Sequence, residues 1–271
     1  MNHFTHERVT HNVTKIEDYN VYTLLIEGED RAILLDTGLG IGNLREYVEK
    51  LTDKPITVYL THAHGDHTFG VGWWDEAYLN EDDFHLFQNV EPKDRIASIK
   101  RLTGKDDIKV EDLAPKFTGK LIPYHDGDII DLGGTTLEVV EIPGHTPGCS
   151  MFLMKEDRIM IYGDAVGRKS GLWSDGTASQ LVAALEHLQE YDDQYDRIFR
   201  FHHGLEWPKG FDKEVLECAR NIVNHTDAHM RVPFSNFEEV YSASIVDLND
   251  PELSRVDGKI GNVLYLPKNA K

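Results

Sequence analysis

The chain has 271 residues, of which 28 are basic and 47 acidic, so its formal charge is −19. Hydrophobic residues make up 40% of it and aromatic residues 10%, which excludes a disordered chain and allows a sizeable core. The negative charge repels phosphate backbones and opposes a nucleic-acid partner. No stretch approaches the ~20 apolar residues of a spanning helix, and residues 1–12 lack the apolar core of a signal peptide. The sequence therefore predicts no membrane partner.

Hydrophobic periodicity and turn residues predict an alternation of strands and helices along the chain. Strands are predicted over residues 20–26, 31–36, 56–60, 129–132, 135–142, 150–154, 158–162, 197–201 and 262–265. Helices are predicted over residues 43–51, 178–191 and 214–230, with shorter ones starting at 81–83 and covering 94–101. Two halves of similar make-up indicate one compact α/β domain over residues 1–271. Within it, residues 73–124 are interpreted as a cap or insertion and residues 205–271 as a C-terminal helix and tail.

The two cysteines, Cys149 and Cys218, form neither a disulfide framework nor a zinc-knuckle pattern. Buried structural thiols are the interpretation for both, and a reducing, cytoplasmic location is the corresponding prediction. The histidines differ from the cysteines, because several of them gather where predicted strands end.

The first cluster follows the strand predicted over residues 56–60. His62 and His64 are two residues apart, so at the end of an extended segment they point the same way and can hold one ion together. Gly65 lets the chain reverse, and Asp66 and His67 then point back toward a second ion. This spacing indicates a metal site with two positions.

Three later strand ends supply further ligands. His145 lies between two Pro-Gly pairs, a rigid turn that fixes one imidazole. Asp164 follows a glycine and offers two oxygens, which can bridge two cations. His203 precedes a glycine and would complete the second ion. Its neighbour His202 is the alternative, and because adjacent strand residues face opposite sides, only one of the two can reach the metals.

Imidazole and carboxylate are the ligands expected for zinc at a catalytic site, with manganese or iron as alternatives. Two zinc ions are the predicted cofactors. Two dications ~3.5–4 Å apart lower the pKa of a bridging water toward ~7 and polarise a substrate oxygen. Two dications, two aspartates and one hydroxide leave a charge of about +1, which favours a developing oxyanion.

These motifs resemble those of the metallo-β-lactamase superfamily in kind and in order. The matching segments are Asp36-Thr37-Gly38, the run from Thr61 to His67, the run from Pro143 to Gly148, Gly163-Asp164 and His203-Gly204. The resemblance implies an αββα sandwich of two mixed sheets between helices, with the metals at one edge. It assigns His62, His64 and His145 to site one, Asp66, His67 and His203 to site two, and Asp164 to a bridging position. Asp36 would orient the first loop without binding metal.

Comparison with subfamily patterns narrows the substrate only partly. Asp164 argues against the true β-lactamases of this fold, and Gly167 stands where quorum-signal lactonases typically carry a tyrosine. His64 differs from the glutamate usual in flavodiiron-type proteins. The ligand set resembles that of glyoxalase II, but its glutathione-binding residues cannot be placed here. The subfamily is therefore left unresolved.

Some further residues have a functional and a plain structural interpretation. His225 and His229 are four apart on the helix predicted over residues 214–230, a spacing that can bind metal, but no third ligand lies nearby in sequence and a solvated helix face is preferred. Trp73, Trp74 and Trp173 follow ligand motifs and can either line a pocket or pack in the core. The acidic residues 81–83 are interpreted as a helix start, not a metal site.

The predicted function is hydrolysis of a small-molecule ester, thioester, lactone, amide or phosphoester by a metal-bridging hydroxide. Asp66, or a water on site two, is the candidate general acid. The first alternative is an iron oxidoreductase similar to persulfide dioxygenases, with one iron at site one. The second is a metal-bound binding protein without catalysis. Homodimer formation is left open.

Overall fold

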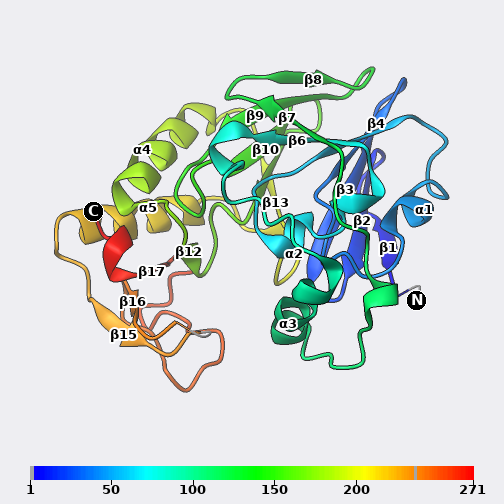
Figure 1. Cartoon of the computed structure of the whole chain (residues 1–271). Coiled ribbons are helices and arrows are strands. Elements are labelled where there is room, and N and C mark those ends of the chain that lie inside the picture. Colours follow the sequence, from blue (N-terminus) through cyan, green and yellow to red (C-terminus); the bar gives the residue numbers. More distant parts are fainter. Residues whose placement is uncertain (1–2, 235–236) are drawn as a thin grey trace.

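The computed structural model of the chain describes residues 3–234 and 237–271, and contains three sheets (Figure 1). The first sheet runs in sequence order: β1 (Thr5–Arg8), β2 (Val13–Asp18), β3 (Val21–Glu27), β4 (Ala32–Leu35), β5 (Ile56–Tyr59), β6 (Glu76–Asn80) and β7 (Lys120–Tyr124). The second has the order β14 (Glu206–Trp207), β13 (Arg197–Arg200), β11 (Ile159–Gly163), β10 (Ser150–Met154), β9 (Thr136–Glu141) and β8 (Ile129–Asp131). The third is β12 (Ser170–Leu172), β17 (Val263–Tyr265), β16 (Val240–Ser242) and β15 (Met230–Val232).

The first two sheets pack face to face, and the alternation of side chains along each strand explains why. Leu24 and Ile26 of β3 point into the cluster between the sheets, whereas Leu25 points to the outer face. In β10, Phe152 points inward and Met151 outward, and all five residues of the strand are buried because both faces are covered. The core between the sheets thus draws alternate residues from both.

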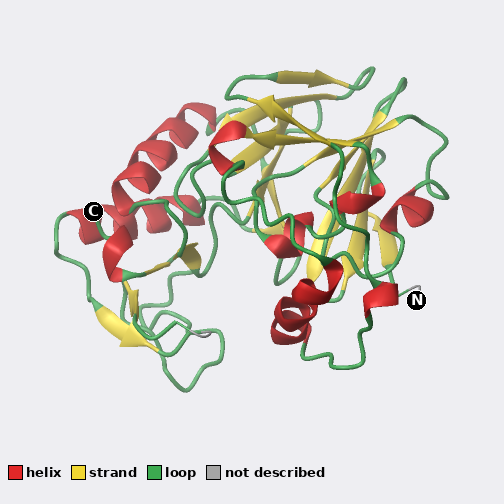
Figure 2. Cartoon of the chain, viewed as in Figure 1, coloured by secondary structure: helices red, strands yellow, loops and turns green. Residues whose placement is uncertain are grey.

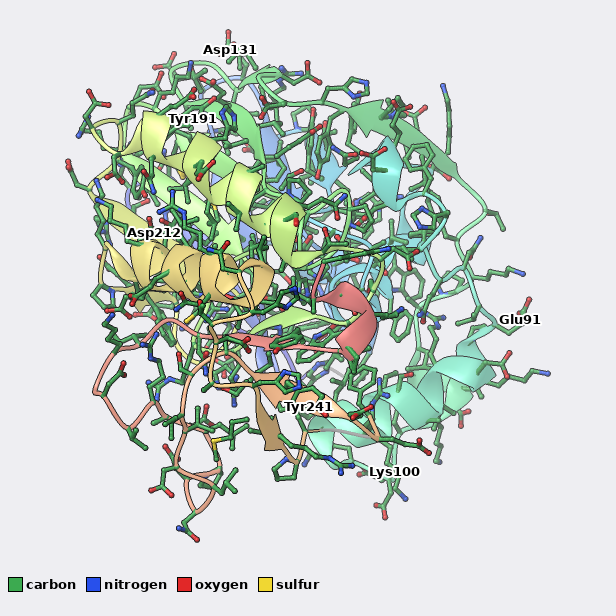
Figure 3. The ribbon with its side chains drawn as sticks, turned by 90° about the vertical axis from the view of Figure 1, so that its left-hand side faces the viewer. Glu91, Lys100, Asp131, Tyr191, Asp212 and Tyr241 are labelled. Atoms are coloured by element: carbon green, nitrogen blue, oxygen red, sulfur yellow. The ribbon has the colours of Figure 1, made fainter. Side chains whose placement is uncertain are left out.

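Helices cover the two outer faces (Figure 2). The helices are α1 (Leu44–Val48), α2 (Gly65–Thr68), α3 (Pro92–Thr103), α4 (Ala178–Leu188) and α5 (Phe211–Val223). α1 packs on the first sheet through Leu44 and Val48, while α4 and α5 pack on the second. Figure 3 shows α4 and α5 side by side. It shows α3, which can be found by the labels Glu91 and Lys100, apart from these two helices. This confirms the predicted αββα sandwich.

The amino-acid sequence explains where α4 and α5 begin and end. Thr177 caps α4 by accepting a hydrogen bond from the backbone N–H of Gln180, whose side chain accepts from the N–H of Thr177. α5 ends at Val223, seven residues before the predicted end at residue 230. The reason is a left-handed backbone at His225 (φ 55°), after which residues 230–232 form β15. His225 and His229 therefore do not share a helix face.

The ends of the segment predicted as a cap or insertion are strands of the first sheet, which differs from the prediction. β6 and β7 pair in parallel over five residues each, so of the segment 73–124 only residues 73–75 and 81–119 lie outside the sheet. The strands β1 and β2, at residues 5–8 and 13–18, were not predicted. In the part of the chain that the structure describes, the longest helix has 13 residues, and no helix is long and apolar enough to cross a membrane.

Candidate metal centre

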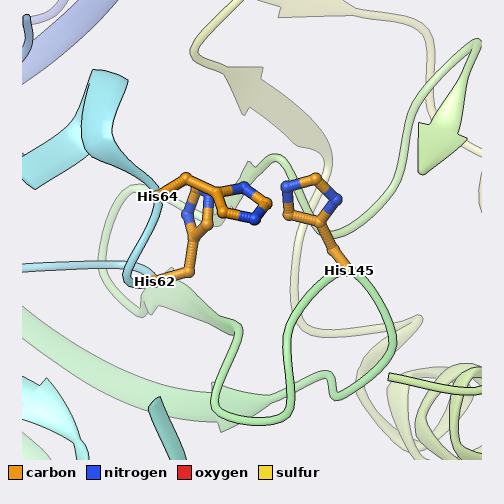
Figure 4. A group of neighbouring side chains, drawn as sticks. All are labelled: His62, His64 and His145. Carbon is orange, nitrogen blue, oxygen red and sulfur yellow. The ribbon is translucent and has the colours of Figure 1, made fainter. Parts of the chain in front are cut away.

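Seven side chains from four strand-end loops meet at the edge of the two sheets. Their donor atoms form three overlapping groups, with the atoms of each group within 4.8 Å of one another: His62, His64 and His145; His62, His67 and Asp164; Asp66, His67 and His202. Figure 4 shows the first group, in which the ring of His145 faces those of His62 and His64 from the opposite loop. The structure thus brings together His62, His64, Asp66, His67, His145 and Asp164, six of the residues predicted from the sequence.

Buried donor atoms in this cluster lack hydrogen-bond partners. His62 Nε2, His145 Nε2 and Asp164 Oδ1 are buried, and no described residue binds them. A buried polar atom without a partner costs roughly 1–3 kcal/mol, so three together in one cluster call for a ligand. A divalent metal satisfies imidazole nitrogens and carboxylate oxygens at once. The residues present therefore fit divalent metal ions.

The other ring nitrogens are held by neighbours that orient the imidazoles. His145 Nδ1 donates to the carbonyl oxygen of Gly171 at 2.9 Å, and His67 Nδ1 donates to Asp36 Oδ2 at 2.7 Å. Such contacts fix the tautomer that leaves Nε2 free to bind metal. His64 is turned the other way, because its Nε2 contacts Ser174 Oγ at 3.1 Å and Nδ1 is left for the cluster.

Asp36 is completely buried and connects two parts of the first loop. Besides His67, it accepts hydrogen bonds from the backbone N–H of Thr61 (2.7 Å) and from Thr61 Oγ1 (2.8 Å). Thr61 Oγ1 in turn contacts His62 Nδ1 at 3.0 Å. Asp36 thus holds His67 directly and His62 through Thr61, which agrees with its predicted orienting role.

The pKa shifts of the histidines differ between the two ends of the cluster. Burial lowers the pKa of His64 to about 3, and burial also lowers that of His145. These imidazoles are neutral at pH 7, as metal ligands must be. Burial likewise opposes the charge of His202, but the Asp164 carboxylate and hydrogen bonds to Asp164 and Asp66 raise its pKa to about 9. The carboxylates therefore favour positive charge at the end of the cluster where His202 lies.

His202, not His203, belongs to the cluster, which corrects the prediction. His202 Nε2 lies 3.3 Å from Asp164 Oδ2, 3.5 Å from Asp66 Oδ2 and 3.3 Å from His67 Nε2. The His203 side chain is 55% exposed, and its nearest carboxylate is Glu252, at 3.8 Å.

The prediction failed because it relied on a strand that had already ended. β13 stops at Arg200, and His203 adopts a left-handed backbone (φ 58°) before Gly204 (φ 100°). The turn directs the His203 side chain away from the cluster, to an exposed position on the wall of the same pocket. The carbonyl oxygen of Asn20 accepts a hydrogen bond from His202 Nδ1 at 2.8 Å and holds His202 in the cluster.

Asp83 connects two of the loops that carry the cluster, a contact that the sequence did not indicate. Its side chain is completely buried and joins the two histidine loops: Oδ2 accepts from the N–H of Ala63 (2.8 Å) and Thr146 Oγ1 (2.7 Å), and Oδ1 accepts from the N–H of Gly148 (2.7 Å). Burial raises the pKa of Asp83, and the three hydrogen bonds oppose that rise. The expected helix start is present as a 3-10 turn over Glu81–Asp83, but in the sequence nothing separates Asp83 from the exposed acids beside it.

We predict that Asp83→Asn weakens metal binding although Asp83 binds no metal. The asparagine amide replaces an accepting carboxylate oxygen with an N–H₂ group, which would face hydrogen-bond donors of the two loops. The free energy of unfolding should therefore fall by about 2 kcal/mol. Metal affinity should fall about tenfold, because both loops carry ligands. Urea denaturation and metal titration measure the two effects, with the exposed Asp82→Asn as the matched control. Equal behaviour of the two variants would contradict the positioning role.

A pocket of about 540 Å³ opens in front of the cluster and is lined by His64, Asp66, His145, Asp164 and His202 among others. Its far wall includes Arg101 and Leu102 of α3. A second wall is aromatic: Trp173 stacks between Phe234 (5.0 Å between ring centres) and Phe237 (5.4 Å), and we call these three residues the aromatic wall.

Trp73 and Trp74, which the sequence also offered as candidate pocket residues, do not line this pocket. Trp74 is buried in the core of the first sheet, and Trp73 packs against that core and donates its indole N–H to the carbonyl oxygen of Gly42. Of these three tryptophans, Trp173 alone lines the pocket.

Solved structures with the same fold have low sequence identity to this chain. A metallo-beta-lactamase from Pontibacter korlensis superposes with a TM-score of 0.59 at 17% identity, over 80% of this chain and 99% of that one. The metallo-beta-lactamase IND-7 gives 0.58 at 14% identity, over 81% and 99%. These likenesses establish the fold.

Sequence relatives include hydrolases. The acyl-coenzyme A thioesterase MBLAC2 of Homo sapiens is 26% identical over 163 residues, which are 52% of this chain and 57% of that protein. The hydroxyacylglutathione hydrolase of Francisella tularensis is 28% identical, over 54% of this chain and 47% of that protein. The matches thus span only about half the length of these relatives. The model of the metallo-beta-lactamase superfamily matches residues 16–209, more than half of the chain. With its fold and its histidine and aspartate cluster, the chain belongs to the metallo-beta-lactamase superfamily.

Proposed function

We propose that the protein is a dinuclear zinc hydrolase that cleaves a small-molecule ester, thioester, lactone, amide or phosphoester. The observation that carries this proposal is the convergence of seven donor residues, three of them with unsatisfied buried atoms, of which five line an open pocket. A metal site that only stabilises the fold is normally closed by its protein ligands, whereas this cluster faces an open cavity.

Esters and thioesters are the favoured substrates within this range. The two hydrolase relatives are named for thioester-type substrates, an acyl-coenzyme A in one and a hydroxyacylglutathione in the other. Their identity to this chain is low, so the names support the bond type and not the particular substrate. A small-molecule substrate, with neither nucleic acid nor membrane as partner, and a cytoplasmic location complete the proposal. The two free, buried cysteines agree with that location.

The residues divide into two ligand sets. His62, His64 and His145 would hold one ion, Asp66, His67 and His202 the other, and Asp164 lies within reach of both sets. When bound, the two ions supply an activated water and polarise the scissile carbonyl. Asp66 lines the pocket, so its carboxylate is the candidate for carrying a proton to the leaving group.

The test is reconstitution of metal-free protein with zinc, manganese or iron. We expect close to two ions per chain by elemental analysis, and hydrolysis of at least one chromogenic ester or thioester at the same rate in air and under nitrogen. Water is the only co-substrate of such a reaction, so oxygen should have no effect.

Three results would overturn this proposal. One tightly held ion per chain would remove the dinuclear arrangement. Oxygen uptake in proportion to turnover of a thiol or persulfide, and only in iron-loaded protein, would place the chain among the iron oxidoreductases. Full metal loading without turnover of any ester, thioester, lactone or phosphodiester would favour a binding protein.

A further inference from the structure

Arg200, the last residue of β13, is a buried cation without a counterion. Only 6% of its surface is exposed, and it lines the pocket beside the metal cluster. Its Nε is buried without a hydrogen-bond partner, and no described carboxylate lies within the 4.0 Å of an ion pair. Burying a charge is costly unless it is paired, so Arg200 needs a partner that the described residues do not supply.

Arg168 adds a second positive charge on the same side of the pocket. Both guanidinium groups lie over the ring of Trp207, Arg200 at 4.9 Å and Arg168 at 5.8 Å. Arg168 also donates to Ser254 Oγ at 2.9 Å and has no ion pair among the described residues. The neighbouring Lys169 is different, because Glu252 pairs with it at 3.1 Å. Two arginines thus share one indole in a chain whose charge is −19.

Gly167 makes room for Arg200 beside the metal cluster. A Cβ built at Gly167 would lie 2.5 Å from Arg200 Nη2, so any larger residue would displace the guanidinium. Gly167 is three residues past Asp164, and Asp164 and Arg200 line the same pocket. Asp164 belongs to the metal-binding cluster, so its charge is not available to neutralise Arg200.

We infer that Arg200 and Arg168 form a subsite for an anionic group of the substrate, a carboxylate or a phosphate. The planar fork of arginine matches both anions with two parallel hydrogen bonds. The substrate would then be an ester or thioester that carries its anionic group close to the scissile bond. This inference rests on the proposed hydrolase function.

The test compares two chromogenic esters, neutral p-nitrophenyl butyrate and negatively charged mono-p-nitrophenyl glutarate. Wild-type protein loaded with zinc should prefer the charged ester by kcat/KM. Arg200→Gln should lower the ratio of charged to neutral kcat/KM by about tenfold or more, mainly through KM, because a charged hydrogen bond is lost. Monomethyl glutarate and glycerol phosphate, used as competitors, distinguish carboxylate from phosphate.

The matched control is Arg197→Gln, which changes the net charge equally on the same strand. Arg197 pairs with Glu206 at 2.7 Å and does not line the pocket, so this variant should keep the wild-type ratio. If Arg200→Gln does not fold, Gly167→Ala tests the same point, because it keeps the arginine but moves its guanidinium. It should also lower the ratio.

Several outcomes would contradict the subsite. An equal loss on both esters would mean that Arg200 only supports the fold. Wild-type protein that cleaves both esters without preference would reject the subsite and leave the hydrolase proposal standing. If no ester is cleaved, the hydrolase proposal fails, and calorimetric titration with monomethyl glutarate still decides: binding lost in Arg200→Gln supports the subsite, and equal binding rejects it.

Discussion

His202→Ala should lose one of two metal ions and reduce turnover by at least about a hundredfold, whereas His203→Ala should keep both ions and most activity. The reason is geometric. His202 Nε2 lies within 3.5 Å of Asp66 and Asp164, whereas the exposed His203 pairs with Glu252 and forms no ion pair with either of these two carboxylates. Removing His202 leaves the second set with only Asp66 and His67 besides Asp164.

Elemental analysis of the two variants measures how many ions each one holds, and ester turnover measures their activity. The two substitutions delete the same side chain from adjacent positions, so each variant is the control for the other. His203→Ala should also leave the unfolding transition nearly unchanged, because that side chain is mostly exposed. Loss of metal in His203→Ala with full occupancy in His202→Ala would restore the assignment made from the sequence.

Asp164→Asn should reduce turnover on the order of a hundredfold or more. Asp164 lies within reach of both ligand sets: Oδ2 is 3.5 Å from His67 Nε2 and 3.3 Å from His202 Nε2 of the second set, and Asp164 also shares a group of donor atoms with His62 of the first. Its Oδ1 is buried and has no hydrogen-bond partner among the described residues. The amide keeps the size of the side chain but replaces one metal-binding oxygen with N–H₂ and removes the negative charge. Both sets should therefore bind metal less tightly.

Metal titration followed by turnover at saturating metal separates weak binding from defective chemistry in Asp164→Asn. Asp175→Asn is the matched control, since Asp175 is 61% exposed and, among the described residues, pairs only with His85, which is exposed as well. It removes the same charge and should leave metal content and turnover as in the unchanged protein. Asp164→Asn with normal affinity at both positions would show that Asp164 does not bridge them.

The sequence by itself determined the fold class and six of the seven clustered residues. Ligand spacing such as that of His62 and His64 is local, and the two rings do lie together, with 4.7 Å between ring centres, although residues 61–63 form a bend and not an extended segment. Turn residues are equally local, so the loops of His145 and Asp164 could be located from their glycines and prolines. Local patterns also placed β10 at its observed bounds.

The tertiary structure alone decided the remaining features, because each depends on segments far apart in the sequence. The choice of His202 depends on where β13 ends and on the carbonyl oxygen of Asn20, 182 residues away. Asp83 reaches Gly148 across 65 residues, and nothing in its own segment marks it. The lack of a counterion for Arg200 among the described residues can be recognised only when its neighbours in the folded chain are known. Periodicity predicts which way a side chain points, but its partners are fixed by packing.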